Sequence, residues 1–436
     1  MNVTYSILTY GRQDLLIRCL QSFRKFHPED PLIVTDNGGP EGDKSKAITE
    51  MYGGLYLNNP PNDSLSKIMN MGVEASKTPY TCITTNGVIF TKRLTEQFEA
   101  NFIRDPKIAV VGGLLFYPSG RIQHGGGFRR WNEGRMGHYG HGKEIEQAGL
   151  CLIPAYRMYV TGAVAAIRKE FWETNHYDEQ LTMSCEDTDI CMKAWVFGNR
   201  VFYDPEITAI HEEGATRGAS VAEKKVKHPE VIKREEESVR IFEERYNDQD
   251  FWEVDRELNR LNRLLHPELP RGFVRTAGMG DVLLTLPIYR YLEQKEKGNI
   301  VVITQMMEVF REEHPKALTQ HIDEYPVSDF INFDLAYERR RQLSIRKGYI
   351  QALVEQDGMP AQMNYPDGSL NSTAWDEFMM RRQVLSKDWN GPYAVVHVKT
   401  GVGPKSLRPD FWAELIDLIQ THLWLSVVLV GGDAPE

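Results

Sequence analysis

Hydrophobic and polar positions alternate along the first 110 residues in a pattern typical of a parallel α/β sheet. Short apolar runs begin at residues 3, 31 and 80, and stretches with helical spacing at 13–26 and 64–76 separate them. Parallel strands need long crossover connections, usually helices, so the alternation predicts such a sheet. The carboxyl ends of its strands, residues 9–12, 36–39 and 84–88, carry polar side chains, and we expect the binding loops there.

The pattern changes after residue 110. Residues 112–142 are rich in glycine, histidine and arginine, a composition that predicts a long functional loop rather than a core element. A helix is expected to begin at Ser184 and end near Gly198, and a strand is expected over 200–211.

A charge-dense stretch then separates two α/β patterns. Residues 221–269 are helix-prone, with charges of both signs spaced for i,i+4 pairing, and a new strand and helix alternation opens at 271. We therefore expect three parts: a first domain over 1–220, a helical connector over 221–270 and a second α/β unit over 271–436.

Composition narrows the class of protein. The 436 residues include 51 Lys and Arg against 61 Asp and Glu, a formal charge of -10, which disfavours general binding to nucleic acid or anionic membranes. No run approaches the roughly 20 apolar residues of a membrane span, and the first residues lack a signal-peptide pattern, so we expect a cytoplasmic protein. The five cysteines form no CxxC pair, which predicts free, buried thiols.

Several motifs of the first domain occur in the order and spacing of a known enzyme family. They are ILTYGRQDLLIRCLQS, VTDNGG, NDSLSKIMNMGVEAS, GRIQHGG, VTGAVAAIRKEFWE, YDEQLTMSCEDTDICMKAW and YDPEITAIHEEGATRG. In these stretches the chain resembles the family 2 glycosyltransferases over about residues 2–220. The resemblance implies an inverting enzyme with the GT-A fold, Rossmann-like with a mixed sheet. Such an enzyme moves a hexosyl or deoxyhexosyl group from a nucleoside diphosphate sugar to a glycan or glycoconjugate hydroxyl, as in polysaccharide biosynthesis.

The resemblance also implies a nucleotide-sugar site at the strand ends. The residues it assigns there are Thr9, Tyr10, Arg12, Asp36, Asn37, Asn62 and Asn86, with His211 and Arg217 near the diphosphate. The chemistry is sensible, because a carboxylate accepts from a base N–H or a ribose hydroxyl and a tyrosine ring offers a stacking face. Asp36-Asn37-Gly38 has an alternative interpretation as an ordinary turn, and Asn62 as a surface or capping residue.

An acidic cluster at the predicted helix start matches the family's catalytic pair. In that match Asp187 is the general base beside Glu186, while Asp189 and His124 lie on the acceptor side of the cleft. Displacement at an anomeric carbon requires removal of the acceptor proton, and a carboxylate in the first turn of a helix is held ionised by the helix dipole. The alternative is structural, because Ser184 and Asp187 are spaced almost as a capping box.

The expected metal motif departs from the family pattern. The family holds Mg²⁺ or Mn²⁺ through a D-x-D motif after the fourth strand, where this chain has Thr84-Thr85-Asn86-Gly87-Val88. Hard cations prefer oxygen ligands that include a carboxylate. Two hypotheses stay open: His211, Asn86 and the nucleotide hold the cation, or cationic side chains such as Arg217 replace it. We expect His138 and His141 to lie in a solvated loop rather than a metal site.

The second α/β unit suggests a further transferase fragment. Its opening GFVRTAGMGDVLLTLPIYRYL and the later YAVVHVKTGVGPKSLRPDFWAELIDLIQTHLWLSVVLVGG resemble the heptosyltransferase-like family 9 glycosyltransferases of GT-B fold. The match implies Asp281 as a candidate base and Lys405 near donor phosphates. Only four residues follow Gly432, so we expect this unit to be incomplete, either truncated, degenerate or a docking or dimerisation element.

A second class of function stays open. The missing metal carboxylates are also compatible with a non-catalytic protein that binds a nucleotide sugar or a glycan. For an enzyme, the expected partners are the nucleotide-sugar donor and a glycan, lipid-linked saccharide or protein acceptor. A homo-oligomer is compatible with the sequence.

Overall fold

The computed structural model describes most of the first 334 residues and a few segments beyond them. The described residues are 2–40, 42–59, 64–129, 136–214, 229–246, 252–276, 279–311, 313, 315–334, 349, 351–353, 355–356, 393–397 and 426–430. The chain divides into two compact units, Met1–Tyr365 and Pro366–Glu436. The described part of the second unit is a parallel strand pair, β17 (Tyr393–His397) and β18 (Ser426–Val430). The predicted boundary at residue 271 therefore lies inside the first unit, described below.

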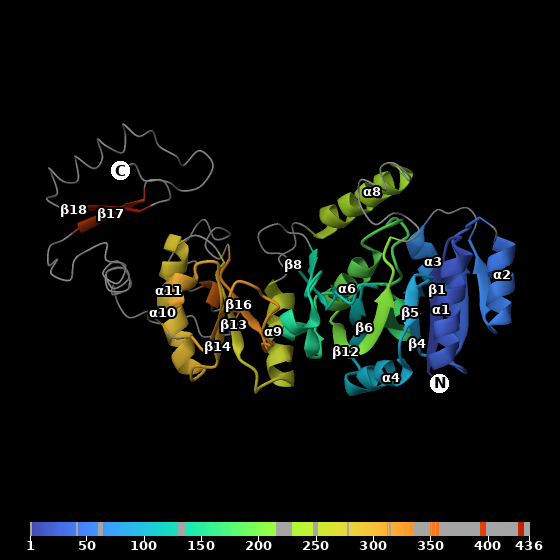
Figure 1. Ribbon diagram of the computed structural model, residues 1–436, viewed down its shortest axis with the longest axis horizontal. Helices are drawn as coiled ribbons and strands as arrows, with labels where there is room; N and C mark the ends of the chain where they lie inside the picture. The colour runs from blue at the N-terminus through green and yellow to red at the C-terminus, as the bar shows by residue number, and fades with distance from the viewer. Residues whose placement is uncertain are drawn as a thin grey trace. The chain divides into compact units, whose positions relative to one another are not determined.

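A large mixed sheet confirms the α/β fold predicted for the N-terminal part (Figure 1). Its strands lie in the order β3 (Leu55–Asn58), β2 (Leu32–Asp36), β1 (Val3–Thr9), β4 (Tyr80–Thr85), β11 (Val164–Arg168), β6 (Ile108–Phe116), β12 (Arg200–His211) and β10 (Ala155–Tyr156). The first four are parallel, and β11 runs antiparallel to both of its neighbours. Two short strands pair off this path, β5 (Val88–Phe90) with β12 and β7 (Ile122–His124) with β6.

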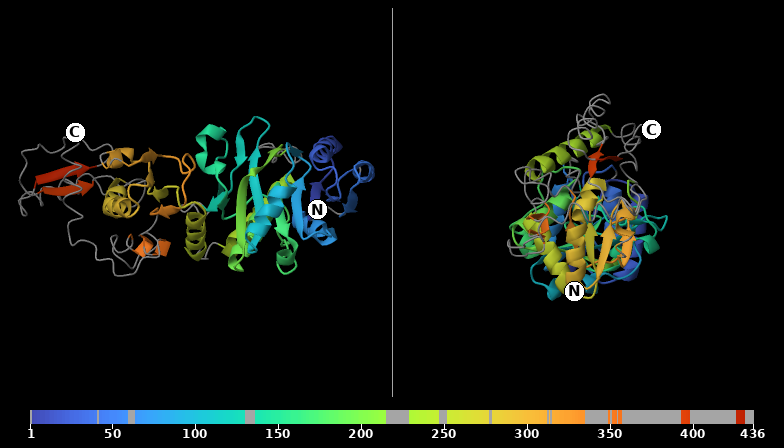
Figure 2. Two further views of the ribbon diagram at one scale, coloured as in Figure 1. Left: turned by 90° about the horizontal axis from the view of Figure 1, so that it is seen from below. Right: turned by 90° about the vertical axis from the view of Figure 1, so that its left-hand side faces the viewer.

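Helices pack against this sheet, as the strand sequences require (Figures 1 and 2). Every residue of β1 and β2 is buried, which is typical of parallel strands covered on both faces. The helices are α1 (Gln13–Phe26), α2 (Gly42–Met51), α3 (Leu65–Ala75), α4 (Thr95–Arg104), α5 (Lys169–Trp172) and α6 (Glu186–Val196), with 3₁₀ turns at Ile145–Gln147 and Gly149–Leu152. The predicted strand over 200–211 is confirmed as β12, and the predicted helix begins at Glu186.

The prediction of a long loop over residues 112–142 is wrong. The described part of this segment holds the end of β6, all of β7, and the antiparallel pair β8 (Gly127–Arg129) and β9 (Met136–His138). Its glycines serve close packing: a Cβ on Gly112 would lie 2.5 Å from the Val160 Cβ, and one on Gly127 would lie 2.1 Å from the Tyr159 ring. Glycine here permits contact between neighbouring layers rather than flexibility.

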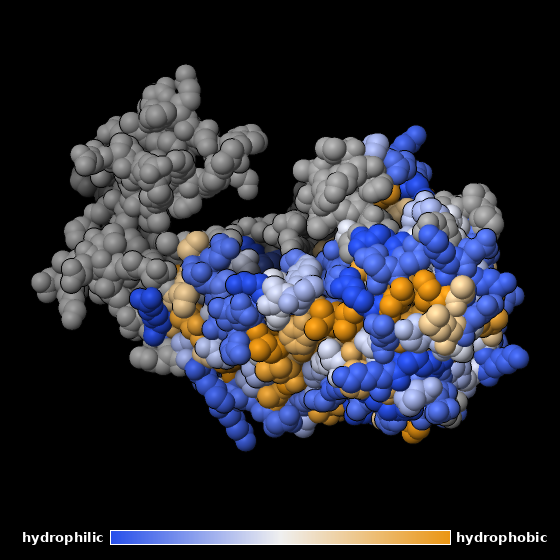
Figure 3. All heavy atoms as spheres, turned by 45° about the vertical axis from the view of Figure 1, so that its right-hand side comes forward, coloured by the Kyte–Doolittle hydropathy of each residue, from blue (hydrophilic) through white to orange (hydrophobic). Residues whose placement is uncertain are grey.

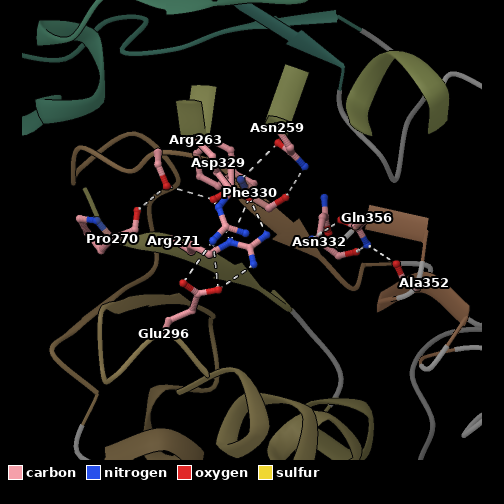
Figure 4. A network of polar contacts seen from close by, with 11 residues as sticks. Asn259, Arg263, Pro270, Arg271, Glu296, Asp329, Phe330, Asn332, Ala352 and Gln356 are labelled. Atoms are coloured by element: carbon pink, nitrogen blue, oxygen red, sulfur yellow. Dashed lines mark hydrogen bonds and ion pairs between the residues drawn. The ribbon is translucent and has the colours of Figure 1, made fainter. Parts of the chain in front are cut away.

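The described part of the charged connector holds the helices α8 (Pro229–Tyr246) and α9 (Trp252–Leu265). In α9, Asn262 accepts from the Tyr156 N–H through Oδ1 at 2.8 Å and donates to the Tyr156 carbonyl through Nδ2 at 3.0 Å. One turn earlier, Asn259 Nδ2 donates to the Phe330 carbonyl at 2.8 Å, as Figure 4 shows. Each side-chain amide thus forms hydrogen bonds with the backbone of a strand, Tyr156 on β10 and Phe330 on β16 (Phe330–Asn332).

A smaller parallel sheet follows α9. Its strands lie in the order β15 (Ala317–Thr319), β14 (Ile300–Ile303), β13 (Arg271–Val274) and β16 (Phe330–Asn332), with α10 (Met279–Lys295) and α11 (Met307–Arg311) as connections. Arg271 binds the carboxylates of Asp329 and Glu296 and so ties β13 to the loop before β16 and to the end of α10 (Figure 4). The predicted strand and helix alternation after residue 271 is confirmed in this part.

The described helices include none with the length and apolar character that crossing a bilayer would require. On the face shown in Figure 3, hydrophobic side chains form small patches separated by hydrophilic ones. Isolated exposed residues such as Met51 and Phe197 are ordinary on the surface of a globular protein. The five cysteines are free, and four of them are buried, as the sequence predicts.

The paired hydrogen bonds of Asn262 give a stability test. Asn262→Leu keeps the side-chain size but leaves the buried N–H and carbonyl of Tyr156 without partners. Because an unsatisfied buried polar group costs about 1–3 kcal/mol, we expect a loss of about 2–4 kcal/mol in the first urea transition. Arg256→Ala, an exposed change on the same helix, is the control and should stay within about 0.5 kcal/mol of the parent. An equal loss of unfolding free energy in both variants would contradict the role of Asn262 in pairing with the backbone of Tyr156.

Candidate active site

The loops expected to bind the nucleotide do lie together at one edge of the sheet. Thr9 pairs with Asp36 in the β1–β2 register, and Leu8 pairs with Thr85 in the β1–β4 register, so three neighbouring strands end at the same level. The loops after β1 and β2 touch, because a Cβ on Gly39 would lie 2.2 Å from the Gly11 nitrogen. The carboxyl edge of β1, β2 and β4 is therefore one continuous surface.

Asp36 is a turn residue in this structure. Its side chain is fully buried, with Oδ1 accepting from the Gly39 N–H at 2.8 Å and Oδ2 accepting from the Tyr56 hydroxyl at 3.0 Å. Burial and the negative charge of Asp36 raise the pKa of Tyr56, so the phenol stays a donor. Asn37 is also buried, and its Oδ1 accepts from Asn59. The geometry supports the turn interpretation for both residues more directly than contact with a nucleoside.

Tyr10 and Arg12 are the accessible residues of the first loop. The Tyr10 side chain is 41% exposed and so offers a ring face at the strand tips. Gly11 and Arg12 both have positive φ, 61° and 52°, which turns the chain sharply into α1. Arg12 donates through Nε and Nη2 to Asp14, and these bonds lower the pKa of Asp14 to about 2. Arg12 is thus an exposed cation anchored to its own helix.

Asn86 faces the same edge from the end of β4. Its Nδ2 donates to Thr9 Oγ1 at 2.9 Å, which fixes the amide orientation. Within the described part of the chain, Oδ1 of Asn86 has no hydrogen-bond partner, so a neutral oxygen remains open to a ligand. This is the oxygen that could contribute to a cation site.

His211 is held by a chain of side chains that fixes its tautomer. Nδ1 lies 3.0 Å from Gln123 Oε1, and Gln123 Nε2 donates to Glu213 Oε2 at 2.9 Å. Because a carboxylate only accepts, the Gln123 amide is oriented, and its Oε1 must accept from Nδ1–H of His211. Nε2 then carries the lone pair and lies 3.3 Å from Thr85 Oγ1.

Glu213 anchors this chain as a carboxylate. Burial raises its pKa, but hydrogen bonds from Gln123 and Tyr117 and the nearby histidines outweigh burial, so the net pKa lies below the ordinary 4.5. Glu213 therefore remains an acceptor at any pH above that value. The sequence argument missed both Gln123 and Glu213, although Gln123 is next to His124 and Glu213 is two residues from His211.

No complete cation site is built from protein side chains in the described residues. Across these segments no three His, Cys, Asp or Glu side chains are placed to hold a metal ion. His211 and Asn86 nevertheless flank one turn, because a Cβ on Gly87, next to Asn86, would lie 3.7 Å from His211 Nε2. An imidazole nitrogen and an amide oxygen fit a partial site that phosphate oxygens would complete.

Asp187 lies beside the start of β11, at the same end of the sheet as the tips of β1, β2 and β4. Its Oδ2 accepts from the Gly162 N–H at 2.8 Å, and its Oδ1 accepts from the Thr188 N–H at 2.7 Å and from the Thr188 hydroxyl. Val164 pairs with Thr84, so Gly162 comes just before β11 at the level where β4 ends. With strands spaced ~4.8 Å apart, about 14 Å separates this position from the tip of β2. The side chain is half-buried rather than enclosed.

The capping-box alternative does not describe this helix start. The residue before α6 is Cys185, which has a left-handed φ of 67° and makes no side-chain cap. Ser184 donates to the Glu235 carbonyl of α8 instead. Asp187 does accept one N–H of its own helix, yet Oδ2 keeps a second lone pair beyond the Gly162 bond.

Asp189 binds side chains of α6 and α8. Asp189 is fully buried and binds Arg245 at 2.5 Å, Tyr246 at 2.9 Å and Lys193 at 2.9 Å. This placement suits a structural tie between α6 and α8 better than the expected contact with the acceptor. Glu186 is buried beside Asp187 at 8% exposure.

His124 does not line the candidate site. It is fully buried, and its Nδ1 contacts Nδ1 of His138 at 2.5 Å. Burial and then the neighbouring His138 hold the pKa of His124 well below 6.5, so the ring is neutral. The expectation of a cleft residue is corrected, because β7 carries His124 into the core, while His138 and His141 are exposed as predicted.

Four predicted residues cannot be placed. Asn62, Arg217 and Lys405 lie outside the described residues, and Asp281 is described only as a backbone position in the first turn of α10.

Comparisons with known proteins identify the part of the chain that holds these residues. Residues 6–186 match the family model of Glycosyl transferase family 2. The uncharacterized protein y4gI of Sinorhizobium fredii (strain NGR234) is 29% identical over 201 residues, which cover 43% of this chain and 22% of that protein. The chain thus spans about a fifth of the curated relative that it matches.

Solved structures with a similar arrangement have low sequence identity. GalNAc-T7 with UDP, GalNAc and Mn²⁺ is 16% identical, with 48% of this chain and 44% of that chain covered at a TM-score of 0.39. TarS of S. aureus is 16% identical, with 62% and 44% covered at a TM-score of 0.39. The family match extends from β1 to the first residue of α6, which includes the three strand tips and Glu186. Residues 6–186 are therefore the part of the chain that is similar to Glycosyl transferase family 2.

Proposed function

We propose that this domain transfers a sugar from a nucleoside diphosphate sugar to an acceptor hydroxyl, with inversion at the anomeric carbon. The observation that carries the proposal is the Asp187 carboxylate, held by Gly162 at the edge where β1, β2 and β4 end. From the family resemblance, we take the sugar to be a hexosyl or deoxyhexosyl group and the acceptor to be a glycan or glycoconjugate.

Asp187 is the proposed general base. The free lone pair of Oδ2 accepts the proton of the acceptor hydroxyl as that oxygen attacks the anomeric carbon. The bond from that carbon to the diphosphate oxygen breaks, and its electron pair leaves with the diphosphate. The N–H groups of Gly162 and Thr188 hold the carboxylate in a fixed orientation through hydrogen bonds. A direct displacement of this kind inverts the anomeric configuration.

The residues at the ends of β1, β4 and β12 are proposed to bind the leaving nucleoside diphosphate. Tyr10 offers an exposed ring to the base, while His211 Nε2 and Asn86 Oδ1 lie near the turn after β4. Mn²⁺ or Mg²⁺ bound with the diphosphate would offset its developing negative charge. His211 and Asn86 would hold that cation, with Gln123 orienting the imidazole. Arg217 remains a predicted phosphate contact.

A non-catalytic binding protein is the second candidate. The observation in its favour is the absence of a carboxylate in the turn Thr85-Asn86-Gly87-Val88, where a cation would normally have one. Such a protein would bind the nucleotide sugar without releasing diphosphate.

Substitution of the proposed base distinguishes these candidates. In Asp187→Asn, we expect diphosphate release from a panel of nucleotide sugars to fall by about 10²–10⁴-fold, since the amide cannot take the proton. Binding of the nucleoside diphosphate, measured by calorimetry, should stay within a few fold. Glu173→Gln, an exposed carboxylate change in the same domain, should keep full activity. If the parent binds a donor yet releases no diphosphate with or without Mn²⁺, the binding protein is correct.

Substitution of Gln123 gives a separate test of the proposed cation binding by His211. Gln123→Leu removes the acceptor that fixes the His211 tautomer, so we expect transfer at limiting Mn²⁺ to fall by about 10–100-fold and the half-saturating Mn²⁺ concentration to rise. Glu213→Gln keeps an acceptor for Gln123 and should lose only a few fold. An unchanged Mn²⁺ dependence in Gln123→Leu would show that His211 does not act through a cation.

A further inference from the structure

A cavity lies beside β10, the outermost strand of the large sheet. It is formed where β8 and β10 meet α9 and the segment before β16. Aromatic and aliphatic side chains make much of its wall, including Phe128, Tyr139, Leu258 and Phe330. Pockets with apolar walls and a few polar groups, placed between packed layers, are the usual form of a small-molecule site.

Arg157 brings an uncompensated cation to this cavity. Its side chain is 95% buried, at 5% exposure, and lines the cavity. One nitrogen, Nη2, donates to the Leu150 carbonyl at 3.1 Å, and the guanidinium lies over the Tyr139 ring at 4.7 Å. Its Nε is buried with no acceptor among the described residues. A guanidinium has five N–H donors, so most of them are unused by the protein.

Two carboxylates, Asp255 and Asp329, line the cavity together with Arg157. Asp329 is bound by Arg271, and within the described segments no carboxylate forms an ion pair with Arg157. Asp255 and Arg129 also line the cavity, so its wall carries charges of both signs besides Arg157. Burying an unpaired charge is expensive unless an ion or hydrogen bonds complete its shell.

We propose that this cavity binds a small molecule through a single oxyanion, a phosphate or a carboxylate group, held by Arg157. The planar fork of a guanidinium matches two oxygens of either group, and the aromatic wall would pack against the body of the molecule. The site uses no residue of the proposed transfer chemistry, so it stands or falls independently of that function.

Calorimetry on the full chain tests the site with three probes: inorganic phosphate, glucuronate and glucose. We expect 1:1 binding of phosphate or glucuronate and none of glucose, and the two anionic probes tell a phosphate from a carboxylate ligand. Arg157→Met should weaken that binding at least tenfold. Arg168→Met is the matched control, because Arg168 also donates to carbonyls and stacks on Tyr80 but lies outside the cavity.

Ile322→Trp keeps the test decisive if Arg157→Met does not fold. Ile322 is a half-buried residue of the wall, and the larger ring would fill the space without altering the guanidinium. Binding should be lost while the circular dichroism spectrum is kept. The proposal is overturned if the parent binds neither anion at up to about 10 mM. It is equally overturned if binding is unchanged in Ile322→Trp or in a folded Arg157→Met, because the anion would then occupy another site.

Discussion

The reversal of one strand organises the candidate site. β11 runs antiparallel between β4 and β6, so the residues that precede it lie at the edge where β1, β2 and β4 finish. This places the Gly162 N–H beside the strand tips, and that N–H holds the carboxylate of Asp187. If β11 ran parallel, Gly162 and the Asp187 carboxylate that it holds would lie away from the tips of β1, β2 and β4.

Ion pairs and a hydrogen bond to Asp189 fix α6, the helix that carries Asp187. Arg245 and Tyr246, at the end of α8, bind the buried Asp189, and Lys193 binds its other oxygen. Asp189 is two residues beyond Asp187, so the first turn of α6 is anchored on its inner side. The two aspartates of the acidic cluster therefore differ in role: Asp187 belongs to the candidate site, and Asp189 anchors the helix that carries it.

The sequence predicted the elements better than the surroundings of single residues. Strand alternation, the helix after Ser184 and the span of β12 follow from local patterns and were found in the structure. The glycine-rich segment was misjudged because composition cannot distinguish glycine that permits a loop from glycine that permits contact with Tyr159 or Val160. His124 was expected on the acceptor side of the cleft and Asp36 in the nucleotide-sugar site, yet both are buried, because burial depends on which strands become neighbours. Gln123 and Asn262 act through long-range pairing, for which the sequence carries no local signal.

The turn before α6 has a consequence for how the site is assembled. Cys185 adopts a left-handed backbone although it carries a side chain, a conformation that costs an L-residue about 1–2 kcal/mol. A free chain would rarely choose that geometry, so the surrounding layers must impose it. We therefore expect the first turn of α6, with Asp187, to form late in folding, after α8 and β11 have packed. We also expect it to be the first part of the site to unfold when either element is destabilised.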